Sequence, residues 1–171
     1  MTSAQERIQQ IQEEIARRAA GPEEGQEMTP PVLVFLLAGE RYAFPLAAVR
    51  EISRLRPVTP LPGLPPSLLG AAGLRGEVLP VIDLRRLLAL PETPSTAASR
   101  LLIVHHEGVT AALLADQVED IGTLPQESIS PPPTSAAGET AAFLQGIAHE
   151  GEQTTRLLDL PRLLEAVRHG R

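Results

Sequence analysis

The chain has 171 residues, 43% of them apolar, with a net charge of −6 and no cysteine. The acidic balance, the lack of Lys/Arg-rich runs and an aromatic content of 2% argue against nucleic-acid binding, which needs a basic face or stacking rings. The cysteine count excludes disulfides and thiolate chemistry, and no apolar run is long enough for direct membrane insertion, so we expect a cytoplasmic protein.

The first predicted element is a helix from Ser3 to Ala20, followed by an acidic, proline-bearing linker over Glu23–Pro31. Its isoleucines, Ile8, Ile11 and Ile15, fall on one narrow face at spacings of three and four, as in a short coiled-coil seam. Two heptads are too few to be stable alone. The helix is therefore expected either to pack on its own domain or to serve in docking or self-association.

A β-hairpin is predicted next, from the apolar strand Val32–Leu37, the turn Ala38–Glu40 and an alternating return strand. The segment Val49–Leu55 fits either a strand or a helical turn. The proline-rich segment Pro57–Pro66 could be a partner motif for aromatic grooves. We interpret it as a stiff loop inside the domain, because strands resume on both sides.

The stretch from 68 to 88 is predicted to form a turn, a strand and a short helix. Gly73 and Gly76 enclose a Leu-Arg turn, and an apolar strand follows over Glu77–Ile82. Pro80 cannot donate a ladder hydrogen bond, which predicts an edge strand or a bulge. Asp83 precedes the leucine-rich segment Leu84–Leu88 and is expected to cap its N-terminus.

Both halves of this pattern recur. Residues 68–88 resemble 144–164, where Asp159 repeats the predicted cap, and residues 32–52 align with 101–121. The extra residues of the second copy fall in a connector over Leu124–Ala142. Many short strands in two copies predict two small β-barrels with a pseudo-twofold relation, which must share an interface because each copy alone is marginal in size. The turn residue Arg75 is not repeated, so it is either a site specific to one copy or a solvated surface arginine.

No motif in the sequence assembles an active site. The four histidines lack the spacing of a zinc site, and the adjacent His105 and His106 must face opposite sides of a strand. Nucleotide-binding glycine loops and the serine elbow of hydrolases are missing from the sequence. Asp116 and Asp120 are expected on a solvated turn. We therefore expect no enzymatic activity, no metal and no cofactor.

The segments GAAGLRGEVLPVIDLRRLL, VLVFLLAGERYAFPLAAVREI and LLIVHHEGVTAALLADQVEDI, in their order along the chain, resemble the CheW family of bacterial chemotaxis coupling proteins. The resemblance covers residues 32 to about 167, and Gly73 stands where the family usually has asparagine. The predicted helical extension and linker, over 1–31, lie outside the family pattern. A CheW-like domain over 32–171 would hold two interleaved five-stranded SH3-like β-barrels, with repeat halves of about 32–90 and 101–167.

The resemblance also implies function. Such proteins are non-catalytic adaptors that couple the cytoplasmic tip of chemoreceptors to the regulatory domain of the CheA histidine kinase, in arrays at the membrane. Carried over by position, Arg75 and Gly76 match the receptor-contact turn, while Val49 and Glu51 lie near it, the acidic residue pairing with the arginine. Gly70 matches a glycine that tolerates little bulk.

The kinase-binding surface implied by the resemblance is less motif-like. It falls around residues in the connector and in the second repeat, namely Val58, Leu61, Leu144, Gly146 and Ile147. An alternative is a regulatory or coupling module of another two-component pathway, linked to pili or to a receiver. A further class, an enzyme regulator or small-ligand module that reuses the fold, stays open because fold alone does not fix function.

Overall fold

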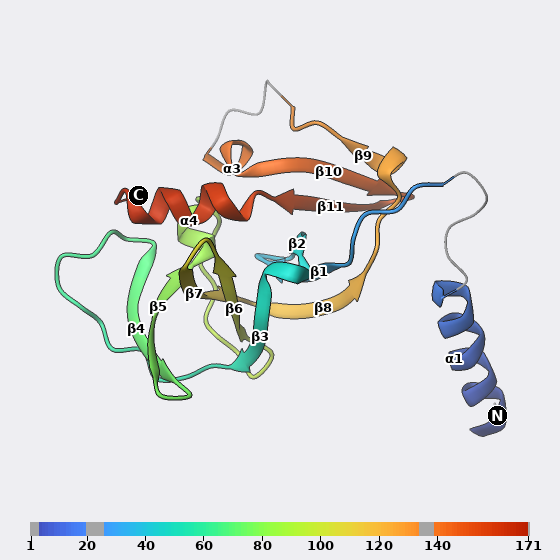
Figure 1. Ribbon diagram of the computed structural model, residues 1–171, viewed down its shortest axis with the longest axis horizontal. Helices are drawn as coiled ribbons and strands as arrows, with labels where there is room; N and C mark the ends of the chain where they lie inside the picture. The colour runs from blue at the N-terminus through green and yellow to red at the C-terminus, as the bar shows by residue number, and fades with distance from the viewer. Residues whose placement is uncertain (1–3, 20–25, 134–138, 171) are drawn as a thin grey trace.

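The computed structural model describes residues 4–19, 26–133 and 139–170 (Figure 1). Its elements, in chain order, are α1 (Ala4–Ala19), β1 (Val32–Leu37), β2 (Glu40–Pro45), the 3-10 turn η1 (Leu46–Ala48), β3 (Val49–Arg54), β4 (Leu68–Leu74), β5 (Glu77–Asp83), α2 (Leu84–Leu87), β6 (Arg100–His106), β7 (Val109–Ala115), β8 (Gln117–Gly122), the 3-10 turn η2 (Gln126–Ser128), β9 (Ile129–Ser130), α3 (Glu139–Ala142), β10 (Leu144–Glu150), β11 (Gln153–Leu158) and α4 (Leu160–Arg168).

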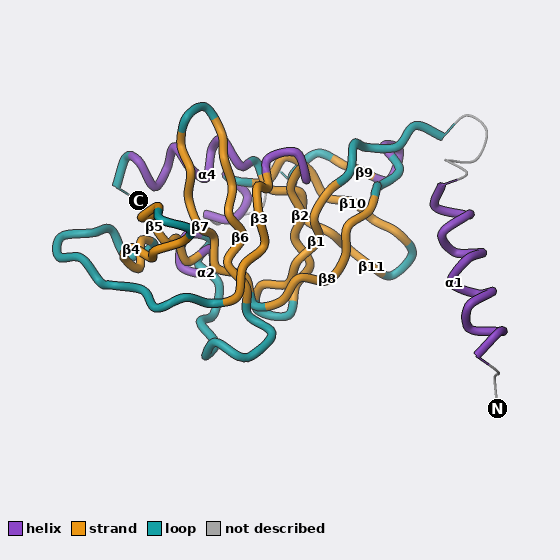
Figure 2. The backbone as a smooth tube through the Cα atoms, turned by 60° about the horizontal axis from the view of Figure 1, so that its bottom comes forward, coloured by secondary structure: helices purple, strands orange, loops and turns teal. Residues whose placement is uncertain are grey.

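The strands form two sheets, and each sheet takes strands from both repeats. One has the order β8-β1-β2-β11-β10-β9 and the other the order β3-β6-β7-β5-β4 (Figure 2). The first hairpin of each repeat is built into the sheet of the other repeat, through the parallel pairings of β2 with β11 and of β5 with β7. The prediction of a mostly β fold with two barrel-like halves is confirmed, although one sheet has six strands and not the predicted five.

The main hydrophobic core lies between the two sheets and is closed by the short helices. Phe35, Phe44 and Leu102 are fully buried in it, together with leucines of α2 and α4 such as Leu84 and Leu163. Because this cluster draws on both repeats, neither repeat has a complete core of its own. Each sheet also covers a smaller cluster on its other side.

Several element boundaries differ from those predicted from the sequence. The segment Leu68–Leu74 is a strand, so the predicted glycine-bounded turn is narrower than expected, and the same holds for Leu144–Glu150 in the second repeat. Of the two alternatives predicted for the segment after Val49, the strand is confirmed, over Val49–Arg54. The predicted connector over Leu124–Ala142 contains η2, β9 and α3, and part of it lies outside the described residues.

Pro80 does not make β5 an edge strand. β5 lies between β4 and β7, but its pairing with β7 covers only Val81–Asp83, so the half that contains Pro80 has a neighbour on one side only. The sequence also allowed a bulge at Pro80. A register shift does occur in the β4–β5 pairing, but it lies between Leu68 and Gly70 of β4.

The N-terminal helix stands apart from the two sheets in both views (Figures 1 and 2). The predicted helix is confirmed over Ala4–Ala19, while its predicted stop at Gly21-Pro22 lies outside the described residues. The predicted linker is shorter than expected, because the backbone oxygen of Glu27 already accepts a 2.8 Å hydrogen bond from the backbone N–H of Gln126.

Candidate functional site

Arg75 and Gly76 form the tip of the β4–β5 hairpin, which closes on the pair Leu74 and Glu77. Their φ angles are +50° and +80°, the left-handed conformation that a two-residue hairpin turn of type I′ needs at both positions. The repeated turns at Ala38-Gly39 and Glu107-Gly108 have the same geometry. The turn explains the backbone of Arg75 but places no demand on its side chain, which is free to serve another role.

The Arg75 side chain is held by Glu51 of β3. Its Nε and Nη2 donate to one carboxylate oxygen, Oε1, at 3.2 and 3.0 Å. Arg50, the neighbour of Glu51, lies 3.8 Å from Glu77 on the other side of the turn. Because β3 and β4 are opposite edges of the same sheet, these pairs link the hairpin tip to the far edge, where the barrel closes.

The pair orients the arginine without covering it. The Arg75 side chain is 77% exposed and that of Glu51 25% exposed. An ion pair this exposed adds little to the free energy of unfolding, because water screens it. The guanidinium is therefore aimed by Glu51 but remains available to a partner.

One residue beside this turn was missed by the sequence analysis. Val78 follows the turn and is 76% exposed, and it pairs across the hairpin with Gly73, which carries no side chain. Strand alternation was the signal that could have found it, since Leu79 and Val81 are buried and Val78 must point the other way. An uncovered apolar side chain thus lies on the same hairpin as Arg75. Val49 is half-buried against the main core and contributes less surface.

The predicted kinase-binding residues do not form one patch. Val58 packs on the small cluster of the five-stranded sheet and Leu61 is exposed in the same connector, whereas the other three lie on β10 of the six-stranded sheet. Leu144 and Gly146 are buried, and Ile147 is half-buried against the main core. The two buried residues offer no surface to a partner in this conformation.

Gly146 and its repeat counterpart Gly70 share a packing role. A Cβ atom at Gly70 would lie 2.1 Å from the backbone oxygen of Thr59, and one at Gly146 would lie 2.8 Å from Cγ2 of Ile129. Gly70 also has a φ of +147°, which side-chain-bearing residues rarely adopt. Both glycines let a connector segment approach the sheet, and at Gly70 the approach leaves no space for a Cβ atom.

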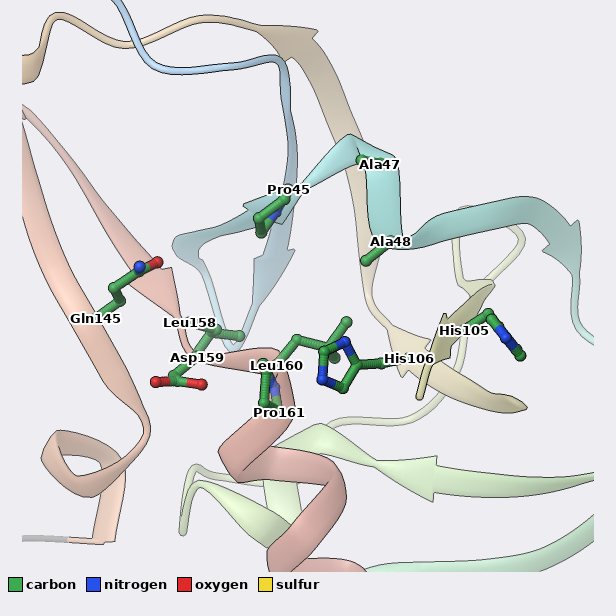
Figure 3. A pocket seen from close by; sticks show the side chains of 10 residues that line it. All are labelled: Pro45, Ala47, Ala48, His105, His106, Gln145, Leu158, Asp159, Leu160 and Pro161. Atoms are coloured by element: carbon green, nitrogen blue, oxygen red, sulfur yellow. The ribbon is translucent and has the colours of Figure 1, made fainter. Parts of the chain in front are cut away.

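A groove of about 510 Å³ lies where the two sheets meet, between η1, the end of β6 and the start of α4 (Figure 3). Its walls are mainly apolar, with His106 and Asp159 among its polar groups. The His106 ring lies near Leu160 and Pro161, whereas the His105 ring points away from them (Figure 3). Nδ1 of His105 lies 2.7 Å from the hydroxyl oxygen of Thr110. The predicted opposite orientation of the two histidines is confirmed, and none of the predicted partner-contact residues lines this groove.

A buried ionic cluster ties the two sheets together. Asp83 caps α2 by accepting from the backbone N–H of Arg85 at 3.0 Å, as predicted, and Asp159 caps α4 through the N–H of Arg162 at 3.2 Å. The Arg85 side chain then turns back into the protein, where its Nε donates to Asp83 at 3.2 Å and its Nη1 lies 3.2 Å from Asp116. Both Asp83 and Arg85 are buried.

Asp116 does not lie on a solvated turn, as the sequence analysis expected. Its second carboxylate oxygen accepts a 2.8 Å hydrogen bond from the backbone N–H of Ala38, at the β1–β2 turn. Asp120, assigned to the same turn, lies in β8 and is exposed. Burial alone would lower the pKa of Arg85, but the Asp83 hydrogen bond and the charges of Asp83 and Asp116 outweigh it and raise that pKa. Arg85 therefore stays charged inside the protein.

The described residues contain no helix with both the length and the apolar character that a membrane span requires. They also contain no group of three or more His, Cys, Asp or Glu side chains placed to hold a metal ion.

Comparison with known proteins places this architecture. Residues 31–168 match the family model of the CheW-like domain. The chemotaxis protein CheW of Bacillus subtilis is 28% identical over 134 residues, covering 78% of this chain and 86% of the relative, and protein FrzA of Myxococcus xanthus is 34% identical, covering 78% and 84%. The crystal structure of the scaffolding protein TtCheW from Thermoanaerobacter tengcongensis superposes with a TM-score of 0.73 at 32% identity, covering 80% of this chain and 92% of that one. The chain thus belongs to the CheW-like family.

Proposed function

We propose that this chain is a non-catalytic chemosensory adaptor, which binds the cytoplasmic tip of a chemoreceptor through the Arg75 turn and the regulatory domain of the CheA kinase through a separate surface. Family membership supports the adaptor role, and the proposed partners are those the family resemblance implies. Recruitment to receptor arrays at the membrane would follow from the receptor contact.

The observation that carries the receptor site is the asymmetry between the two repeats at this turn. Arg75 is exposed and is oriented by Glu51, while the equivalent turn of the second repeat reads Gly151-Glu152. A feature needed only for folding would be expected in both copies. An oriented arginine on the same hairpin as the uncovered Val78 combines charge with apolar surface, which is the composition of interface residues that are costly to truncate.

The kinase surface is proposed around Leu61 and Val58, in the connector that packs on the five-stranded sheet, with Ile147 on the six-stranded sheet as a second contact. Leu61 is about half exposed in a connector held against the sheet by the Thr59–Ala71 pairing, with hydrogen bonds of 2.8 and 3.0 Å. An apolar side chain displayed on a fixed loop suits docking on another protein, because little order is lost on binding.

The test titrates Arg75→Ala against a receptor cytoplasmic fragment and, separately, against the CheA regulatory domain. We expect receptor affinity and receptor-dependent kinase control to fall by at least tenfold, the scale of an interface arginine, while kinase affinity and thermal unfolding stay unchanged. Glu51→Ala should show a milder loss for receptor only. Leu61→Ala is the matched control, with loss for kinase only. Equal losses against both partners would contradict the two-surface proposal, and loss against neither would leave Arg75 a solvated arginine.

The alternative function is that of a coupling module in another two-component pathway, such as one that controls pili. FrzA of Myxococcus xanthus and PilI of Pseudomonas aeruginosa, the latter 32% identical over 117 residues, are relatives that do not carry the CheW name. The same Arg75 titration can be run with receptor fragments from different signalling systems. The fragment whose binding depends on Arg75 then identifies the pathway.

A further inference from the structure

The first nine residues of α1 lie exposed on the surface of the described chain. Every residue from Ala4 to Gln12 is exposed, and the large apolar side chains Ile8 and Ile11 are 55% and 59% exposed. The helix lies apart from the two sheets in both views (Figures 1 and 2). Gln26 and Glu27 are bonded to η2, and in this arrangement no described part of the body covers Ile8 or Ile11.

The apolar residues of α1 are spaced as a coiled-coil seam. Ile8 comes four residues after Ala4, and Ile11 comes three residues after Ile8. These spacings place the three residues at the d, a and d positions of a heptad. The helix has 16 residues, close to the length below which an isolated helix is marginal in water. A second helix against the seam would supply the burial that the isolated helix lacks.

The charges beside the seam fit a second copy of the same helix. In the sequence, Arg7 and Glu14 are seven residues apart and both take the g position, next to the seam. In an antiparallel pair the g positions of the two helices face each other, which would place Arg7 of one copy beside Glu14 of the other, twice by symmetry. A parallel pair would instead set Arg18, at a d position, against its own copy, which like-charge repulsion disfavours.

We propose that α1 is a self-association element, which pairs antiparallel with α1 of a second copy of this chain through Ile8 and Ile11. In that register Ile8 of one copy lies against Ile11 of the other. The seam is two heptads long, so the pair is weak in dilute solution and gains strength wherever copies are concentrated. This inference is independent of the proposed adaptor function.

The lack of cysteine in the chain gives a clean test by disulfide capture. Ile8→Cys and Ile11→Cys are made in the full chain, one of them with a longer affinity tag, and are oxidised separately and as a mixture. If the helices pair antiparallel, the yield of the mixed disulfide between Ile8→Cys and Ile11→Cys should be severalfold higher than the yield of either disulfide-linked homodimer. Homodimers that form equally well in each variant alone would overturn the antiparallel arrangement. Capture no better than that of Gln10→Cys, on the outer face, would overturn self-association.

Charge reversal provides a second test that keeps the seam intact. Sedimentation equilibrium of the full chain at rising concentration should show association that Arg7→Glu weakens severalfold. The double variant Arg7→Glu/Glu14→Arg should restore it, because the facing charges are again opposite. Circular dichroism controls for loss of helix. If the double variant is as weak as the single one, or if no variant changes the association, the pairing proposed here is wrong.

Discussion

Replacing Asp83 by alanine should destabilise the protein far more than the same change at Asp159, although the two residues are repeat-related helix caps. At Asp159 the loss is the cap itself, about 1 kcal/mol, because Asp159 and its partner Arg162 are partly exposed. At Asp83 the change also leaves the buried Arg85 guanidinium without its main partner. Removing one member of a buried ion pair costs about 3 kcal/mol or more.

The remaining partners of Arg85 keep the expected total near the lower end of that range. Asp116 at 3.2 Å and the hydroxyl of Thr93 at 3.0 Å would still bind the guanidinium. We therefore expect Asp83→Ala to lower the free energy of unfolding by about 3 kcal/mol, or roughly 10 °C in melting temperature for a chain of this size. Asp159→Ala should lower it by about 1 kcal/mol, or roughly 3 °C.

Urea unfolding followed by far-UV circular dichroism measures both variants, and an unchanged m value shows that the denatured state is comparable. Asp83→Asn keeps a capping oxygen and removes the charge, so it should fall between the wild type and the alanine variant. Adding Arg85→Leu to Asp83→Ala should cost less than the sum of the two single changes, because no buried charge is then left unpaired. Equal losses for the two aspartates would refute the reasoning from the buried cluster.

Two further predictions concern packing. Deleting residues 1–25 should leave a folded chain whose melting temperature changes by less than about 3 °C, because the first residues of α1 bury nothing, and size-exclusion chromatography with calorimetry checks it; an insoluble or much less stable truncation would show that α1 belongs to the core. Gly70→Ala should cost about 3 kcal/mol in urea unfolding, since its Cβ would overlap the backbone of Thr59 and its φ is unfavourable. Gly146→Ala should cost about 1 kcal/mol, because its Cβ would meet the movable end of the Ile129 side chain and would reach the backbone oxygen of Ser130 only at 3.1 Å. Similar losses at both glycines would contradict this difference.

The features that could be predicted from sequence are local ones. The hairpin turn at Ala38-Gly39 and the cap at Asp83 depend on residues within a few positions of one another, and both were found from residue type and spacing. The strand at Leu68–Leu74 was missed because its glycines and alanines read as turn chemistry, while its neighbours, β5 and the connector at Thr59, supply the pairing. A strand whose stability comes from its neighbours carries a weak signal of its own.

Arg85 and Arg86 show where sequence reasoning ends. They are adjacent, identical in type and equally consistent with a solvated helix, yet Arg85 is buried and Arg86 is exposed. Arg85 turns inward to Asp83 and to Asp116, and Asp116 lies 31 positions away from Arg85 in the sequence, directly after β7. The Glu51–Arg75 pair depends in the same way on barrel closure, and only the family resemblance pointed to it.

The exchange of hairpins between the repeats would hold the two proposed partner surfaces in a fixed relation to each other. β2 is paired with β11 and β5 with β7, so each sheet loses a central strand pairing if either repeat moves away. Asp116 adds a polar link, because it holds both the β1–β2 turn and Arg85 of α2. The hairpin that carries Arg75 therefore cannot shift relative to the rest of the chain without breaking core contacts. A change confined to the exposed Arg75 guanidinium leaves all of these contacts in place, and for that reason its effects on binding can be separated from effects on folding.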